Sequence, residues 1–281
     1  MADSRPQLTL EHLQFIKDGV AFIQKEEPSV YEEASQVPYD RLFAILCDDF
    51  GWSYLYECSL KETAVFYFAA LGLIPIIQEH LSQGVEINKA IMDVASQAEK
   101  HTNDIFEEAF AGCSEKPTIE ELRAVRFGLG NMFEFSDLFA LTYSLLGHMS
   151  ALRKFGRDMS QLVEDVRNGI DESFFHAVRI DPTVLACAPF VKRMSMARLQ
   201  DDSEFFSLLG NALKVKWKKP KVDLDPLRVI LHGLNDSGQL DTLSEKDADT
   251  LLIKNLQVYS DDGEDPARSL YRFIQRWKHN K

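Results

Sequence analysis

Cysteines are few in this sequence, and their spacing excludes two common kinds of site. The four cysteines, Cys47, Cys58, Cys113 and Cys187, are far apart and include no C-x-x-C pair. This spacing predicts neither a structural zinc site nor a dense disulfide framework. A chain with so few and so widely spaced cysteines is typical of a reducing compartment. We therefore expect the protein in the cytoplasm.

Short catalytic motifs are missing as well. The chain has no G-x-S-x-G, no G-x-x-x-x-G-K-S/T and no H-E-x-x-H. Gly128-Leu129-Gly130 is only a fragment of a dinucleotide-binding fingerprint, and no strand pattern precedes it. We therefore predict no bound cofactor, and the sequence favours binding over catalysis.

Long apolar runs are also scarce. The longest, residues 64–77, has 14 residues and contains Pro75. A run of this length is too short for a bilayer span and is typical of a buried helix. The N-terminal residues lack the apolar run of a secretory signal. We expect a soluble protein with no membrane segment.

Positive charge is scarce in the first half of the chain only. Residues 1–140 contain 24 Asp and Glu against 10 Lys and Arg, whereas residues 141–281 contain 20 against 21. This asymmetry fits an acidic body with a separate region that contacts acidic partners, or two halves that dock on each other. The pI of about 5.0 argues against nucleic-acid binding by the whole surface, but it permits a local basic patch.

Helical periodicity is what the sequence has in abundance. After Thr9, which fits an N-cap, apolar residues recur at spacings of three and four: Leu10, Leu13, Ile16, Val20 and Ile23. A similar apolar stripe runs through residues 86–110 and predicts about seven turns of helix.

Helix start and stop signals divide the rest of the chain. Two capping-box patterns and three Asp-Pro pairs precede apolar-periodic segments: Ser59 with Glu62, Thr118 with Glu121, Asp181-Pro182, Asp225-Pro226 and Asp265-Pro266. Gly84 and Gly156 are natural helix stops. Pro75 predicts a kink in the 64–77 helix, and Gly128 with Gly130 predicts an interruption of the helix that ends at Phe155.

These patterns predict an all-α protein, a multi-helix bundle of long helices followed by a set of shorter helices. The predicted domains are an acidic helical domain over residues 1–156 and a smaller helical region over residues 157–281. The lysine-rich stretch 214–225 is a second candidate boundary and the better linker by composition.

The last predicted helix has two opposite faces. At 100° per residue from Pro266, its large apolar residues share one side: Leu270, Phe273, Ile274 and Trp277. Arg268, Arg272 and Arg276 lie on the opposite side and are candidate partner-binding residues. The lysine tract upstream adds further candidates: Lys214, Lys216, Trp217, Lys218 and Lys219.

Three interpretations of this basic face stay open: a solvated or self-docked surface, a contact for the acidic surface of a protein partner, and a contact for nucleic acid. A three-helix unit with a basic last helix is typical of helix-turn-helix readers, and Trp217 offers a stacking side chain. The connection over residues 260–265 argues against DNA, because it carries four acids close to where phosphates would lie.

Two further groups of residues are candidates for contacts. Trp52, Tyr54 and Tyr56 alternate just after Gly51, and a packed core is the first interpretation of the aromatic residues in this region. Because Trp and Tyr are enriched at interfaces, these three are also candidate partner-binding residues, in a pocket or at an interface. His101, Asp104 and Glu108 on the 86–110 helix form an alternative metal or ligand site of a helical-bundle enzyme. The Glu-x-x-His motif of di-iron bundles is absent from the chain.

Two other histidines have simpler interpretations. His148 lies among apolar residues and is predicted at a core edge, and His176 follows Glu172 at the spacing of a helix pair. The sequence as a whole favours a soluble, intracellular interaction or regulatory protein that acts by macromolecular binding. A protein is the expected partner and nucleic acid the alternative, and the oligomeric state is not predicted.

Overall fold

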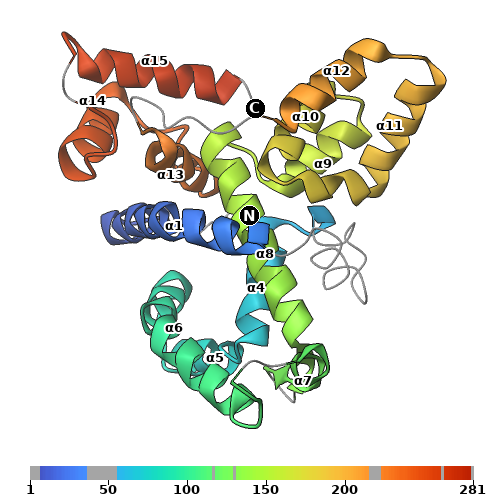
Figure 1. Ribbon diagram of the computed structural model, residues 1–281. Helices are drawn as coiled ribbons and strands as arrows, with labels where there is room; N and C mark the ends of the chain where they lie inside the picture. The colour runs from blue at the N-terminus through green and yellow to red at the C-terminus, as the bar shows by residue number, and fades with distance from the viewer. Residues whose placement is uncertain are drawn as a thin grey trace. The chain divides into compact units, whose positions relative to one another are not determined.

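A computed structural model of the chain describes residues 7–36, 56–115, 118–128, 131–214, 223–260 and 263–279. Helices form most of this part of the chain, and its strands form one two-stranded antiparallel sheet (Figure 1). The predicted all-α class is therefore confirmed.

The contacts divide the chain into two compact units. Unit 1 consists of residues 1–30 and 218–281, and unit 2 of residues 31–217. The later dividing point falls inside the lysine-rich stretch 214–225. Gly156, the expected boundary between domains 1–156 and 157–281, lies within unit 2, where it ends a helix in the left-handed conformation with φ of 70°.

Unit 1 is built from helices at both ends of the chain. In order they are α1 (Leu10–Gln36), whose first part belongs to this unit, α13 (Asp225–Asp236), α14 (Glu245–Ala248), the π-helix η3 (Asp249–Asn255) and α15 (Pro266–His279). The Thr9 hydroxyl accepts a hydrogen bond from the backbone N–H of His12 at 3.3 Å, as expected of the N-cap of α1.

One apolar core holds unit 1 together. Leu13 of α1 packs with Leu231 of α13 and with Leu252 of η3, all fully buried. The side-chain amide of Gln239 fixes the start of the chain, because it accepts from the Leu8 N–H at 2.6 Å and donates to the Leu8 carbonyl at 3.0 Å. Segments more than 200 residues apart in sequence therefore share one core.

Unit 2 contains the remaining elements. In chain order they are α4 (Leu60–Ala70), α5 (Ile74–Ser82), α6 (Ile87–Phe110), α7 (Ile119–Ala124), β1 (Arg126–Phe127), β2 (Phe133–Glu134), α8 (Phe135–Phe155), α9 (Met159–Arg167), α10 (Asp171–Ile180), the 3-10 helix η2 (Pro182–Ala186), α11 (Ala188–Leu199) and α12 (Ser203–Ala212).

Helix α8 connects two apolar cores within unit 2. Leu138 and Leu141 near its start pack with α4, α5, α6 and the hairpin, while Ala151 near its end packs with α9 to α12. α8 also lies along α4 (Figure 1). Helix α8 thus contributes to one apolar core near each of its ends.

The 64–77 segment differs from the single kinked helix that was predicted. α4 ends at Ala70 and α5 begins at Ile74, with a bend of 98° between them. The N–H of Gly72 donates to Ala69 O and the N–H of Leu73 donates to Phe68 O, which is a Schellman motif with Gly72 at φ of 66°. Pro75 stands in the first turn of α5 and does not kink a continuous helix.

These two helices also bear on the membrane prediction. No single helix in the described ranges is both long and apolar enough to span a bilayer. Of the helix pairs in these ranges, only α4 and α5 taken together have the length and apolar composition of a membrane span, and a bend of 98° separates them.

The interruption near Gly128 is larger than a bend. After α7 the chain forms a hairpin in which Arg126 pairs with Glu134 and Phe127 with Phe133, and α8 begins only afterwards. Gly128 has φ of 75°, and a Cβ there would stand 2.7 Å from the Ala69 carbonyl oxygen. Only glycine fits this conformation and this close approach to the end of α4, which is why the predicted helix stops here.

Candidate functional site

Helix α15 is fixed in unit 1 by its inner face. Leu270 and Ile274 have 0% and 1% of their surface exposed, and Phe273 and Trp277 pack beside them. Asp265 caps the helix, because its carboxylate accepts from the backbone N–H of Arg268 at 3.0 Å. The amphipathic pattern read from the sequence therefore positions this helix as expected.

The outer face of α15 carries the three predicted arginines. The side chains of Arg268, Arg272 and Arg276 are exposed, and within the described ranges none of them forms an ion pair. Among the described residues, their guanidinium groups donate a single hydrogen bond, a long contact of 3.4 Å from Arg276 Nε to the Arg272 carbonyl. Since each step of four residues advances about 6 Å along a helix, the guanidinium groups form a stripe.

Lys278, on the same helix, has a different role. Its Nζ donates to the Leu240 carbonyl at 2.8 Å and approaches Asp241 Oδ1 at 3.3 Å, and its side chain is only 20% exposed. Lys278 thus ties the last turn of α15 to the loop after α13. The cations of α15 therefore divide into one structural lysine and three arginines that face solvent.

The lysine tract and the aromatic group fall largely outside the described residues. Lys214 is exposed just after α12. The other predicted contact residues of these two groups lie outside the described ranges: Lys216, Trp217, Lys218, Lys219, Trp52 and Tyr54.

Tyr56 lies in the interior of unit 2 and does not line a surface. It is 0% exposed, its hydroxyl donates to Asp181 Oδ2 at 2.5 Å, and its ring packs edge-on against His148. A Cβ on Gly147 would stand 2.5 Å from the Tyr56 oxygen, so the α8 glycine makes room for this ring. The packed-core interpretation describes Tyr56, and His148 is fully buried beside it.

Neither of the two buried or half-buried thiols nearby is suited to nucleophilic catalysis. Burial is the main cause that raises the pKa of Cys187 to about 12, and Asp181 adds to it. Burial and the neighbouring Glu62 and Glu57 raise the pKa of Cys58. Both thiols stay protonated near neutral pH, so they are poor nucleophiles.

The alternative metal site is not assembled by the described residues. Asp104 and Glu108 are exposed on α6, and the side chain of His101 lies outside the described part of the structure. No group of three His, Cys, Asp or Glu side chains in that part is placed to hold a metal ion.

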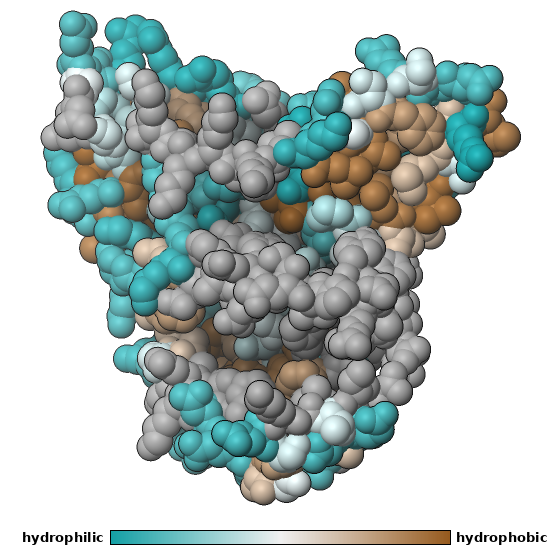
Figure 2. All heavy atoms as spheres, viewed as in Figure 1, coloured by the Kyte–Doolittle hydropathy of each residue, from teal (hydrophilic) through white to brown (hydrophobic). Residues whose placement is uncertain are grey.

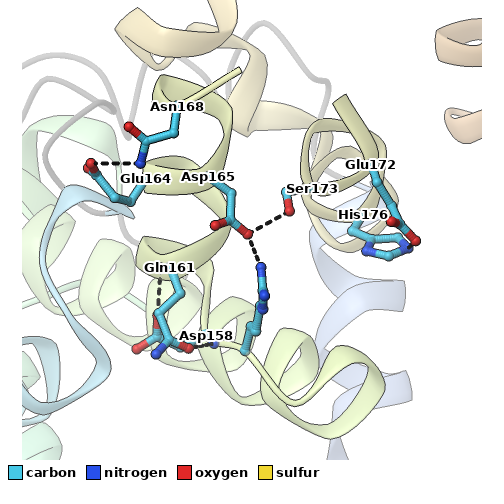
Figure 3. Close-up of polar contacts among 9 residues, drawn as sticks. Asp158, Gln161, Glu164, Asp165, Asn168, Glu172, Ser173 and His176 are labelled. Atoms are coloured by element: carbon cyan, nitrogen blue, oxygen red, sulfur yellow. Dashed lines mark hydrogen bonds and ion pairs between the residues drawn. The ribbon is translucent and has the colours of Figure 1, made fainter. Parts of the chain in front are cut away.

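Helices α9 and α10 hold a group of polar side chains (Figure 3). Asp165 accepts a hydrogen bond from the Ser173 hydroxyl at 2.7 Å and forms an ion pair with Arg157. The Ser173 hydroxyl therefore donates to a carboxylate that is already paired with Arg157. This contact joins α9 to α10.

His176 forms the helix pair that its spacing predicts. Its Nε2 lies 3.8 Å from Glu172 Oε1, and its ring stacks on Phe155 with centroids 3.9 Å apart (Figure 3). Burial lowers the pKa of His176 despite the opposing effect of Glu172. The imidazole is therefore neutral near pH 7 and packs against α8.

A second surface was not predicted from the sequence. Figure 2 shows hydrophobic residues gathered over α10, α11 and α12. The large apolar side chains exposed on α11 and α12 are Val191, Met196, Leu199, Phe206, Leu208 and Leu213. On α11 the apolar residues occur around the whole helix, so no single stripe marks which of them are exposed.

Comparison with known proteins adds no further assignment to these sites. No protein-family model matches the chain, and no curated protein and no solved structure is significantly similar to it.

Proposed function

We propose that this protein is an interaction or regulatory protein that binds an acidic segment of a partner protein through the outer face of α15. One observation supports the proposal. Arg268, Arg272 and Arg276 face solvent without an ion pair among the described residues, on a helix whose inner face is buried. Three exposed cations on a rigid helix are already positioned to bind.

The spacing of the three arginines suits a row of carboxylates better than a single carboxylate. Arginines that start from backbone positions about 6 Å apart along a helix match carboxylates that repeat every four residues on a partner helix, and each guanidinium group can form two parallel hydrogen bonds to one carboxylate. Exposed ion pairs contribute about 0.2–1 kcal/mol each and are screened by salt. The expected affinity is therefore modest, and it falls as the ionic strength rises.

Nucleic acid is the less suitable partner for this face. Glu264 and Asp265 are exposed at the start of α15, one turn before Arg268. Their carboxylates repel phosphates, whereas a partner with separate acidic side chains can avoid them. Binding of duplex DNA is therefore an outcome of the test and not the proposal.

The test reverses the three charges together. Full-length protein with Arg268→Glu, Arg272→Glu and Arg276→Glu is titrated against fluorescent poly-L-glutamate and against duplex DNA, with anisotropy as the readout. We expect the wild type to bind poly-L-glutamate in low salt and the triple variant to bind at least tenfold more weakly. The melting temperature stays nearly unchanged, because glutamate near the start of a helix is favourable and near its end unfavourable by similar amounts.

A matched control separates this face from net charge. Lys192 and Arg198 of α11 and Lys246 of α14 are also exposed, and their replacement by glutamate changes the net charge equally. This control is expected to retain most of the binding. The proposal fails if both triple variants lose binding equally, if poly-L-glutamate does not bind, or if DNA binds more tightly than poly-L-glutamate.

A further inference from the structure

Unit 2 contains a cavity of about 660 Å³ between the end of α4, the last turn of α6 and the β1–β2 hairpin. Its size is within the range of small-molecule sites. Three buried apolar residues and three polar residues contribute to its lining: Leu71, Val125 and Phe127, and Glu108, Arg126 and Asn131. The cavity therefore combines an apolar wall with a few polar groups.

Two helices end at this cavity. α4 ends at Ala70 and α6 at Phe110, and neither has a basic residue in its last turn. The C-terminus of a helix carries a partial negative charge from carbonyl groups without partners in the helix. At the end of α4 the Phe68 and Ala69 carbonyls already accept from Leu73 and Gly72, so the two helix ends favour a cation through their dipoles and not through free carbonyl groups. No side chain in these last turns supplies a positive charge.

The side-chain charges of the cavity point the same way. Arg126 is occupied, because its Nη2 lies 2.7 Å from Glu134 Oε1 and its Nη1 donates to the Val125 carbonyl at 3.3 Å. Glu108 is exposed and has no ion pair among the described residues. The arginine is neutralised by its partner, so the carboxylate of Glu108 is the uncompensated charge of the lining.

The cavity does not depend on a ligand to form. Gly128 brings the hairpin against the end of α4, where a Cβ would meet the Ala69 and Ala70 carbonyl oxygens at 2.7 and 2.9 Å. Phe127 beside it is 2% exposed and packs against Phe110 and Phe135. The wall formed by the hairpin is thus fixed by packing, which lowers the entropy cost of binding.

We propose that this cavity binds a small organic cation. The ammonium group of the ligand pairs with the Glu108 carboxylate near the C-termini of α4 and α6, and its apolar body lies against Leu71, Val125 and Phe127. This site is in unit 2 and is independent of the arginine face of α15.

Three probes of similar size test the charge preference. 2-Phenylethylamine, 2-phenylethanol and 3-phenylpropionate carry a positive, a neutral and a negative group on the same ring, and their binding to the full chain is measured by calorimetry or ligand-observed NMR. We expect the amine to bind most tightly and the carboxylate most weakly. Glu108→Gln should weaken binding of the amine by about two- to fivefold, as expected for an exposed ion pair, and leave the alcohol unchanged.

Two controls locate the site. Glu107→Gln removes a neighbouring exposed carboxylate that does not line the cavity, so amine binding should be retained. Ala124→Leu fills the cavity from an exposed position and should abolish binding of all three probes, whereas Ala111→Leu, exposed but outside the lining, should not. The proposal is wrong if the amine shows no preference, if Glu107→Gln and Glu108→Gln act alike, or if Ala124→Leu has no effect.

Discussion

At the scale of single residues, the hydrogen bond between Tyr56 and Asp181 joins two distant parts of the chain inside unit 2. Asp181 is 1% exposed, accepts from Tyr56 at 2.5 Å, and caps η2 by accepting from the backbone N–H of Thr183 at 2.9 Å. Burial raises the pKa of this carboxyl, and the two hydrogen bonds lower it only in part. The protonated form is therefore favoured by the folded state.

This raised pKa predicts how stability depends on pH. A carboxyl that binds its proton more tightly when folded stabilises the fold below its unfolded pKa, and this contribution is lost as the pH rises through the folded pKa. The free energy of unfolding of the wild type should therefore fall, relative to Asp181→Asn, as the pH rises above the ordinary aspartate pKa of about 4. Denaturant unfolding of both proteins at increasing pH above that value measures the difference. A constant or growing advantage of the wild type would contradict the raised pKa.

Sequence analysis predicts local contacts between residues but not this one. The capping boxes at Ser59 with Glu62 and at Thr118 with Glu121 are confirmed, because each depends on residues three apart. Tyr56 and Asp181 are 125 residues apart. No local pattern places them together, so the sequence leaves Tyr56 between a packed core and an interface and does not identify Asp181 as its partner.

At the scale of elements, Arg193 of α11 joins the starts of two other helices. Its guanidinium forms two hydrogen bonds to Asp171 of α10, at 2.6 and 2.7 Å, and lies 3.5 Å from Asp202, the N-cap of α12. It also lies 4.2 Å from the centroid of the Phe205 ring. The Asp171 contact is the main cause that raises the pKa of Arg193, so the charge is permanent.

Replacement of Arg193 by lysine should destabilise unit 2 although the charge is kept. Lysine cannot donate two parallel hydrogen bonds or stack flat on the Phe205 ring. We expect a loss of about 1–2 kcal/mol in the free energy of unfolding, reduced from the value for buried charged hydrogen bonds because the side chain is 21% exposed. Chemical denaturation measures it, with exposed Lys192→Arg as the control. Equal stability of Arg193→Lys and the wild type would show that the bidentate contact contributes nothing.

The sequence predicts where helices form better than it predicts where they are interrupted. The stripe over residues 86–110 and the arginine-faced last helix form as predicted, since each depends on periodicity within one segment. The break at Gly72 was missed because apolar residues continue on both sides of it and Pro75 suggested the kink instead. The hairpin after Arg126 was missed because its strands have only two residues each.

At the scale of the whole molecule, the two units differ in net charge, although less sharply than the two halves of the chain do. Residues 31–217 contain 28 Asp and Glu against 17 Lys and Arg, and residues 1–30 with 218–281 contain 16 against 14. The arginine face of α15 therefore belongs to a nearly neutral unit and the proposed cation cavity to an acidic one. Each proposed ligand has a charge opposite to that of the side chains proposed to bind it.

The division into units could not be read from the sequence because unit 1 is discontinuous. Composition marks the stretch 214–225, and Pro28 lies two residues before the earlier dividing point inside α1, but no sequence pattern links these two places as the boundaries of one unit. The long-range contact of Leu13 with the α13 core is what assigns the first residues to unit 1.

This division predicts which helices share stability. Leu231 and Leu162 are both 0% exposed, one in the core of unit 1 and the other in the core around α9 and α10. Truncation of either to alanine should cost about 2–5 kcal/mol. In hydrogen exchange measured by mass spectrometry, Leu231→Ala should accelerate exchange in α13, η3 and α15 and leave α9 to α12 unchanged, whereas Leu162→Ala should do the reverse, because local opening follows cooperative units. If Leu231→Ala accelerated exchange throughout residues 157–281, that region would unfold as one domain, as the sequence alone predicted.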